Sequence, residues 1–292
     1  FFKQKTAYEI KECDWSSDVC SSDLNTTASY STAVGYQAAY SNTTGTGITA
    51  LGYQALIANV TGTNNTAVGY TALFSNTGDR NNGFGYQALY ANTSGADNSG
   101  FGNNSLRFNT TGAYNTALGN QALYSNTTAS NNTAVGYQAG YTNSTGGYST
   151  YLGYQAGYTQ NSDNNVCIGN RAGYSATGAG TTAIGAYAGQ ALTTGTLNTF
   201  VGQGSGEYIT TGGKNSILGK YSGNQGGLDI RTSSNYIVLS DGDGQPRMVS
   251  DGSGNISTTI GSTLYGAYPA RAWVNFKDRK STRLNSSHIP LS

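Results

Sequence analysis

The side chains that most often carry nucleophilic or metal chemistry are nearly absent from this sequence. Its 292 residues include three cysteines and one histidine. Cys167 stands alone, Cys13 and Cys20 lie near the start of the chain, and His288 lies near its end. A catalytic site needs a nucleophile beside a base, or a cluster of groups with shifted pKa values, and no spacing here supplies either. We therefore expect no enzymatic activity, no catalytic residues, no cofactor and no metal.

The acidic residues offer one further candidate for metal chemistry, the DGDG segment at 241–244 with Asp251 downstream. A calcium loop of the EF-hand type also needs a downstream bidentate glutamate, which is missing here. Asp-Gly pairs are instead typical of tight hairpin turns. We expect a turn at 241–244 that follows a strand at Tyr236–Leu239, and another strand at Ile256–Ile260.

The overall composition excludes several classes of partner. The net charge is +1 and only 10% of residues are charged, so the chain offers no electrostatic surface for nucleic acid or an anionic membrane. No apolar run approaches the roughly 20 residues of a membrane span, so we expect no membrane insertion. The 23 tyrosines indicate an ordered chain, because disordered chains are usually poor in aromatic residues.

The elements that must carry any function are short repeats. An apolar residue followed by glycine recurs about every 17 residues, in a unit that reads N-T-A-V-G-Y-Q-A-L-Y-S-N-T-T-G plus one or two residues. The N-T-T-G stretch is typical of turns, and a glycine fixed in each unit is expected where φ is positive or two backbones approach closely. The repeat glycines are Gly35, Gly52, Gly69, Gly85, Gly102, Gly119, Gly136, Gly153, Gly169, Gly185, Gly202 and Gly219.

This repeat predicts an all-β fold, a parallel β-solenoid with about twelve coils of 17 residues over residues 25–223. A unit this short cannot bury a face alone, but stacked units can. Rungs spaced about 4.8 Å apart would give a rod ~58 Å long. We expect the apolar residue before each glycine to point into the coil, with its neighbours outside or at a subunit contact. The resulting core is thin, which favours a homotrimer that shares one apolar axis. Residues 224–277 form a small β module in this scheme.

Tyrosines line up in two rows if each unit forms one coil. Phenol rings in a row could bind sugars or a partner surface, because they combine an apolar ring with a polar tip. They could instead form a structural ladder at the coil corners or between subunits, and this is the interpretation we favour. The first row holds Tyr36, Tyr53, Tyr70, Tyr86, Tyr137 and Tyr154, and the second holds Tyr40, Tyr90, Tyr124, Tyr141, Tyr158 and Tyr174.

A row of threonines supports a third hypothesis, an ice-binding solenoid face. One threonine recurs two residues before the apolar position, which gives a single regular threonine in each coil. This hypothesis is the least favoured, because only that one row is regular. Its members are Thr32, Thr49, Thr66, Thr116, Thr133 and Thr182.

The two ends of the chain differ sharply in composition from the repeats. Lys3–Leu24 and Asp278–His288 resemble in-frame translations of short-read sequencing adapters. This resemblance implies that residues 1–24 and 278–292 are artefacts, that Cys13, Cys20 and His288 are not native, and that the remainder is an internal fragment.

The NTAVGYQA units, such as Asn65–Ala72 and Asn132–Ala139, resemble the head repeats of trimeric autotransporter adhesins. Those heads are trimeric left-handed parallel β-rolls, although the period here is longer and a tyrosine follows the glycine. The repeats are more similar to those of phage tail-fibre and appendage proteins. Gly226–Asp251 and Gly266–Phe276 also resemble modules of marine tailed-phage structural proteins.

The phage resemblance implies a structural fibre segment on a virion that supports attachment to the host surface. The implied partners are two further copies of the chain, other fibre or tail proteins, and host cell-surface glycans. The alternative is a head segment of a trimeric autotransporter adhesin on the bacterial outer surface.

Overall fold

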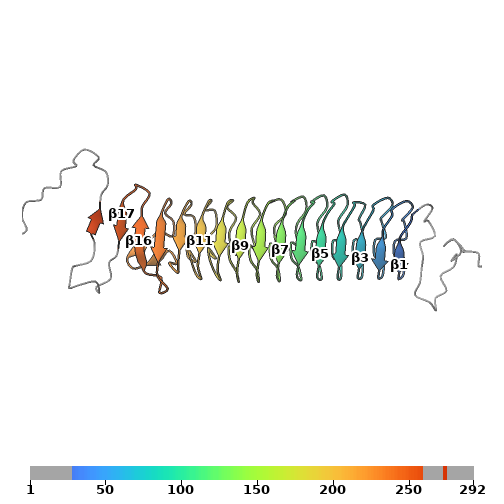
Figure 1. The fold of residues 1–292 in the computed structure, drawn as a ribbon, viewed down its shortest axis with the longest axis horizontal. Coiled ribbons are helices and arrows are strands. Elements are labelled where there is room, and N and C mark those ends of the chain that lie inside the picture. Colours follow the sequence, from blue (N-terminus) through green and yellow to red (C-terminus); the bar gives the residue numbers. More distant parts are fainter. Residues whose placement is uncertain (1–27, 259–271, 275–292) are drawn as a thin grey trace, which may run out of the picture.

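The chain forms a straight solenoid in the computed structural model, which describes residues 28–258 and 272–274 (Figure 1). The described residues contain strands and turns but no helix, as the short repeats predicted. The adapter-like ends at 1–24 and 278–292 lie outside the described residues, as does most of Gly266–Phe276.

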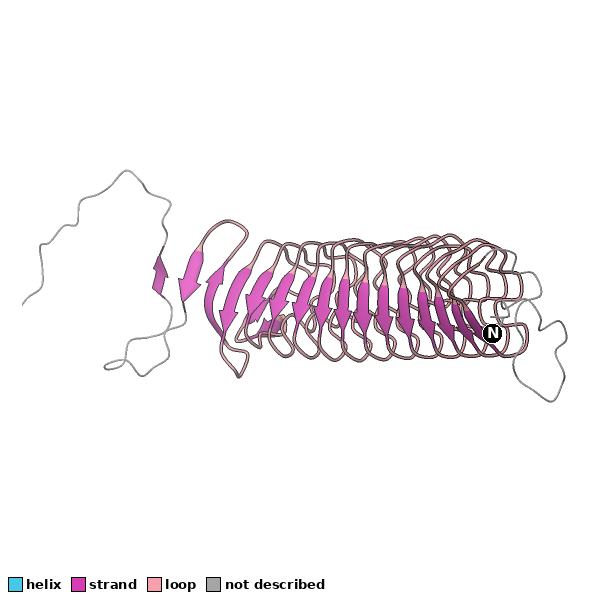
Figure 2. Cartoon of the chain, turned by 45° about the vertical axis from the view of Figure 1, so that its right-hand side comes forward, coloured by secondary structure: helices cyan, strands magenta, loops and turns pink. Residues whose placement is uncertain are grey.

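Each repeat contributes one three-residue strand, and the return segments run behind the strands as loops (Figure 2). The solenoid strands are β1 (Thr32–Val34), β2 (Thr49–Leu51), β3 (Thr66–Val68), β4 (Asn82–Phe84), β5 (Ser99–Phe101), β6 (Thr116–Leu118), β7 (Thr133–Val135), β8 (Thr150–Leu152), β9 (Val166–Ile168), β10 (Thr182–Ile184), β11 (Thr199–Val201) and β12 (Ser216–Leu218). The strands that follow are β13 (Asn224–Gln225), β14 (Leu228–Asp229), β15 (Ile237–Ser240), β16 (Pro246–Ser250), β17 (Ile256–Thr258) and β18 (Ala272–Val274).

One sheet runs through the whole described region. Strands β1 to β12 pair in sequence order, parallel and with equivalent repeat positions opposite each other, and β15 adds to β12 in the same parallel register. Strands β16, β17 and β18 then continue the sheet in antiparallel pairs. The predicted parallel β-solenoid of about twelve coils is confirmed, and so are a strand and hairpin turn around 241–244 and a strand at Ile256.

The repeat glycines allow successive coils to approach closely. All twelve have φ between +109° and +143°, a conformation that side chains other than hydrogen rarely permit. A Cβ atom on Gly35 would lie 2.6 Å from the carbonyl oxygen of Gly52 in the next coil. Glycine is therefore required here both for the backbone conformation and for the space, as the sequence predicted.

The apolar residue before the repeat glycine points outward, so our prediction that it fills the coil is wrong. Ala117 at the centre of β6 is fully buried, whereas Leu118 beside it is 50% exposed. Successive side chains of a strand point to opposite faces, so only one of the two can lie inside. The narrow interior is already occupied by Leu123 and Ala122 of the return segment, and the strand therefore contributes its small residue.

Two buried rows of asparagine connect the coils from inside. In the first row, Asn109 Nδ2 donates to Asn92 Oδ1 at 2.6 Å and to the carbonyl oxygen of Gly112 at 2.9 Å. In the second, the backbone N–H of Asn115 donates to Asn98 Oδ1 at 3.0 Å. These side chains are completely buried, and their amides supply partners to backbone groups that would otherwise lack them. The asparagines thus belong to the core rather than only to surface turns.

Candidate interaction surface

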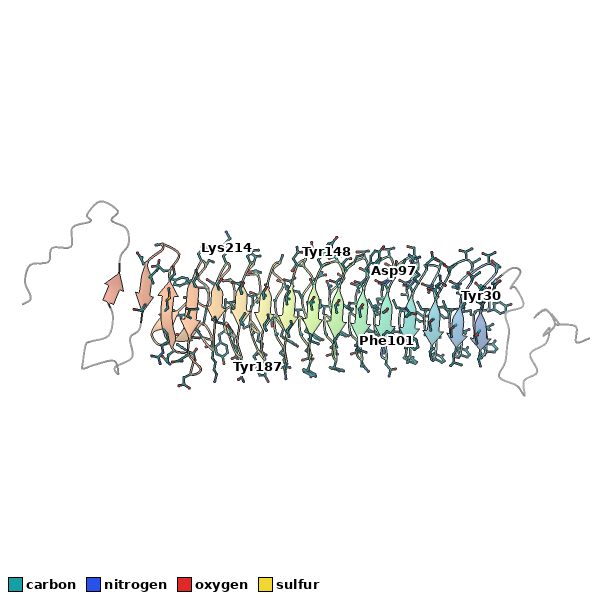
Figure 3. All side chains as sticks on the ribbon, viewed as in Figure 1. Tyr30, Asp97, Phe101, Tyr148, Tyr187 and Lys214 are labelled. Atoms are coloured by element: carbon teal, nitrogen blue, oxygen red, sulfur yellow. The ribbon has the colours of Figure 1, made fainter. Side chains whose placement is uncertain are left out.

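The outer face of the sheet carries an unbroken row of apolar side chains, which we call the aliphatic row. Each strand presents its first and third residues outward, and the third is always aliphatic or phenylalanine. Leu118 and Leu218 are 50% and 56% exposed, and Phe101, labelled at the end of β5 in Figure 3, is 38% exposed. The row consists of Val34, Leu51, Val68, Phe84, Phe101, Leu118, Val135, Leu152, Ile168, Ile184, Val201, Leu218 and, on β15, Leu239.

An apolar row on both faces of a sheet is typical of a sheet that is covered on both sides. A sheet with one solvated face normally alternates apolar residues inside with polar residues outside. Here Ala134 is buried and its outward neighbour Val135 is also apolar, and the same holds along the solenoid. The parallel register places the row in a straight line, because each member pairs with the equivalent residue of the next coil. The result is a continuous apolar strip suited to a large, flat partner.

The predicted threonine row lies on the same outer face, at the first position of each strand. Thr32, Thr49 and Thr66 are directly paired, and Thr116 pairs with Thr133. The row is interrupted where other residue types take this position, at Asn82, Ser99, Val166 and Ser216. The face is therefore a mixed threonine and aliphatic surface rather than a uniform array of hydroxyl groups.

The first tyrosine row lies next to the sheet, directly after the repeat glycines. The rings of Tyr36, Tyr53, Tyr70 and Tyr86 stack with centroids 5.0–5.4 Å apart and nearly parallel planes. Two asparagines interrupt the row before Tyr137 and Tyr154, which stack at 5.5 Å. All six predicted members are between 41% and 49% exposed. Each inner ring is covered on its faces by its neighbours, so the row presents ring edges and hydroxyl groups to solvent.

The second tyrosine row is most regular from Tyr124 to Tyr174. Tyr124, Tyr141, Tyr158 and Tyr174 stack at 5.0 Å, with planes within 12° of parallel. Burial is the largest cause that raises the pKa of Tyr141, followed by the neighbouring Tyr124. The hydroxyl is therefore neutral around pH 7. Stacked aromatic pairs contribute roughly 0.5–1.5 kcal/mol each beyond area burial. This geometry favours the structural interpretation of the rows, and recognition by their members stays a hypothesis.

A row of glutamines separates the two tyrosine rows and connects the same coils. Gln138 Nε2 donates to Gln121 Oε1 at 2.8 Å, and Gln155 Nε2 donates to Gln138 Oε1 at 2.9 Å. Arg171 ends this run, because its Nε donates to Gln155 Oε1 at 3.1 Å and its guanidinium lies 5.0 Å from the Tyr174 ring centroid. The flank of the solenoid thus carries parallel rows, and within each row the side chains of successive coils contact one another.

The candidates for reactive chemistry occupy structural positions. Cys167 is buried at the centre of β9, and burial raises the pKa of its thiol to about 12, which keeps it protonated and unreactive. Asp241 accepts backbone N–H groups of Gln245 at 2.9 Å and Asp243 at 3.0 Å, and also pairs with Arg247. Within residues 28–258 and 272–274, no group of three or more His, Cys, Asp or Glu side chains could hold a metal ion.

The comparisons with known proteins give no relative for this arrangement: no protein-family model, no curated protein and no solved structure matches the chain. The described part of the chain also contains no helix that could cross a membrane.

Proposed function

We propose that this chain is the shaft-like segment of a homotrimeric fibre, and that its aliphatic row faces the two other copies. The observation that carries the proposal is the continuous apolar row on the outer sheet face, from Val34 to Leu239. A straight row on a straight solenoid can pack along its full length against equivalent rows. Three such rows around one axis would bury apolar surface that a single thin coil leaves in water.

The setting we propose is a phage tail fibre or another virion appendage that supports attachment to the host surface. The support is the resemblance of the repeats to phage fibre proteins and the extended, rigid shape of the solenoid. A long trimer would space an attachment site from the virion and display three copies of it, so that weak contacts act together. Its other partners would be tail or fibre proteins. The proposal includes no enzymatic step, no nucleic-acid partner and no membrane insertion by this segment.

The alternative is the head segment of a trimeric autotransporter adhesin on the bacterial outer surface. It rests on the NTAVGYQA units and uses the same trimeric packing and the same mechanical role. The ice-binding hypothesis is weaker, because Asn82 and Val166 interrupt the threonine row on the outer face.

The molar mass in solution tests the trimer directly. We expect light scattering after size exclusion to give three times the chain mass of 30.3 kDa. The double substitution Leu118→Lys with Leu152→Lys places charges in the aliphatic row and is expected to give the monomer mass with an unchanged circular dichroism spectrum. Leu197→Lys is the matched control, because Leu197 is 58% exposed but lies outside the row. A monomeric wild-type chain would contradict the proposal.

A further inference from the structure

The solenoid departs from its period directly after the twelfth coil. Leu218 of β12 pairs with Leu239 of β15, a separation of 21 residues instead of 17. The additional chain forms the small hairpin of β13 and β14, visible as the loop at the lower edge near the C-terminal end in Figure 1. Tyr221 anchors this hairpin, because its buried hydroxyl donates to the carbonyl oxygen of Leu228 at 2.7 Å. In repeat proteins, insertions of this kind often lie on the face that binds a ligand.

The hairpin and the two preceding coils border a shallow pocket of about 530 Å³ that is open to solvent. This volume is within the range of small-molecule sites, roughly 300–1,000 Å³. The pocket is lined by Ala191, Tyr208, Thr210, Asp229, Arg231 and Thr232. It therefore combines one aromatic ring, hydroxyl groups and an ion pair in one concave surface.

Tyr208 differs from the tyrosines of the two rows. It is 53% exposed, and among the described residues no aromatic ring stacks on it. The coil below has Ala191 at the equivalent repeat position, six residues after the repeat glycine. A methyl group cannot cover a phenol ring, so Tyr208 keeps a face free for a ligand, which the inner members of the stacked rows do not.

The polar side of the pocket is an exposed ion pair. Arg231 Nε and Nη2 donate to the two carboxylate oxygens of Asp229 at 3.0 and 2.8 Å. The hydrogen bond from Arg231 is the largest cause that lowers the pKa of Asp229, so the carboxylate is ionised at neutral pH. The two charges cancel overall, while free lone pairs and N–H groups remain to accept and donate hydrogen bonds.

We infer that this pocket binds a neutral saccharide unit, with the sugar ring against Tyr208 and its hydroxyls toward Asp229 and Arg231. A pyranose has an apolar face of C–H groups and a rim of hydroxyl groups, which matches a free phenol face beside paired donors and acceptors. The balanced charge favours a neutral sugar over an acidic one, because an anion would have to compete with Asp229. The inference rests on the proposed attachment role, for which a sugar site supplies a recognition chemistry.

Saturation-transfer difference NMR on the full chain tests this site. The probes are the methyl glycosides of glucose, galactose and N-acetylglucosamine, with glucuronic acid and N-acetylneuraminic acid as acidic counterparts. We expect at least one neutral glycoside to bind, with the strongest transfer to its C–H face. Tyr208→Ala should weaken that binding roughly tenfold or more, and Tyr208→Phe should retain it.

Two further variants keep the test decisive. The double substitution Asp229→Asn with Arg231→Gln alters exposed side chains and should weaken binding, whereas Tyr187→Ala, which removes a ring outside the pocket, should not (Figure 3). Binding of acidic sugars only, no binding by any neutral glycoside, or binding that Tyr208→Ala leaves unchanged would overturn the inference. A trimeric mass without sugar binding would remove this site and leave the fibre proposal in place.

Discussion

The two halves of the solenoid have the same backbone but fill it with different side chains. In the first six coils the strand centre is alanine or glycine, and five of the six have a leucine four residues after the repeat glycine, such as Leu73 or Leu123. From the seventh coil that later position is glycine, and a larger residue enters from the strand centre in four of these six coils, whereas Ala134 and Ala183 keep the small residue. Tyr151 lies against Gly140 and Gly157, and Phe200 lies against Gly189 and Gly206.

The first buried asparagine row, which holds Asn92 and Asn109, changes one coil later. Asparagine occupies it from Asn42 to Asn143, and then Gln160, Ala176, Leu192 and Ile209 follow. The row is imperfect at the change, because the buried Oδ1 of Asn126 and Oε1 of Gln160 have no hydrogen-bond partner. The comparison shows that the coil specifies a total interior volume and not the residue that supplies it, as in other well-packed cores.

The largest expected loss of stability comes from replacing a repeat glycine. It should be similar in both halves, because both have the same backbone at this position. We expect Gly102→Ala and Gly185→Ala each to lower the free energy of unfolding by about 3 kcal/mol or more, through positive φ and the clash of the new methyl group with the next coil. Urea denaturation measures this. Gly242→Ala is the control, since no atom lies within 4 Å of its added Cβ. A cost below ~1 kcal/mol in either half would contradict the close-approach explanation.

The second prediction concerns the residues that fill the interior of the coil. It replaces the large strand-centre residue of the second half with the leucine used in the first half. Phe200→Ala should cost about 3–5 kcal/mol, because the flanking glycines cannot fill the cavity. Adding Gly206→Leu, which restores the arrangement of the first half, should recover part of that loss, since leucine is already accepted at φ near +50° in Leu73. A double-mutant cycle from urea denaturation measures the coupling. Costs that simply add would mean that the two positions do not share one volume.

A smaller loss of stability is expected from the buried asparagine row, which is polar in the first half and apolar near the end of the second. Asn109→Ala removes hydrogen bonds to Asn92 and to the Gly112 carbonyl, and it takes from the Asn126 amide one of its two acceptors, leaving only the Ala129 carbonyl. We expect a loss of about 2–3 kcal/mol. Leu192→Ala is the comparison in the apolar half, where the loss should follow from the cavity alone, and thermal unfolding measures both. An Asn109→Ala variant as stable as the wild type would show that the polar row adds nothing to the core.

The sequence predicts the architecture well because the repeat is a property of the chain itself. The 17-residue spacing, the turns and the fixed glycines lead directly to a parallel solenoid and to positive φ at Gly35 and its equivalents. The inward and outward faces of the strand were assigned the wrong way round, because hydrophobicity alone favours Leu118 over Ala117 as the buried residue. Only the volume taken by Leu123 inside the coil decides the matter. The sequence did carry a signal for this. In the first half a small strand-centre residue accompanies leucine four residues after the repeat glycine, and in the second half glycine takes that later position.

The candidate surface was only partly predictable. The tyrosine rows follow from the period, but their stacking geometry, which covers the ring faces, depends on the rung spacing and side-chain orientation. The pocket at Tyr208 could not be found from the repeat, because the hairpin that completes it is the part of the chain that breaks the period. Its one sequence signal was the increase from 17 to 21 residues between Leu218 and Leu239.

The in-register pairing of equivalent positions has a consequence for how such a protein changes over generations. Each coil contacts the coils beside it, so a whole 17-residue unit can be gained or lost by recombination between near-identical repeats while every remaining contact is rebuilt by its new neighbour. Each such event would change the rod by one rung, ~4.8 Å. Within the first six coils the exchange is neutral, whereas at Tyr151 it would separate a large ring from the glycines that accommodate it. The length of the rod is therefore the property of this molecule that evolution can adjust most freely. It changes by one coil at a time, at sites away from the boundary between the two halves near Tyr151.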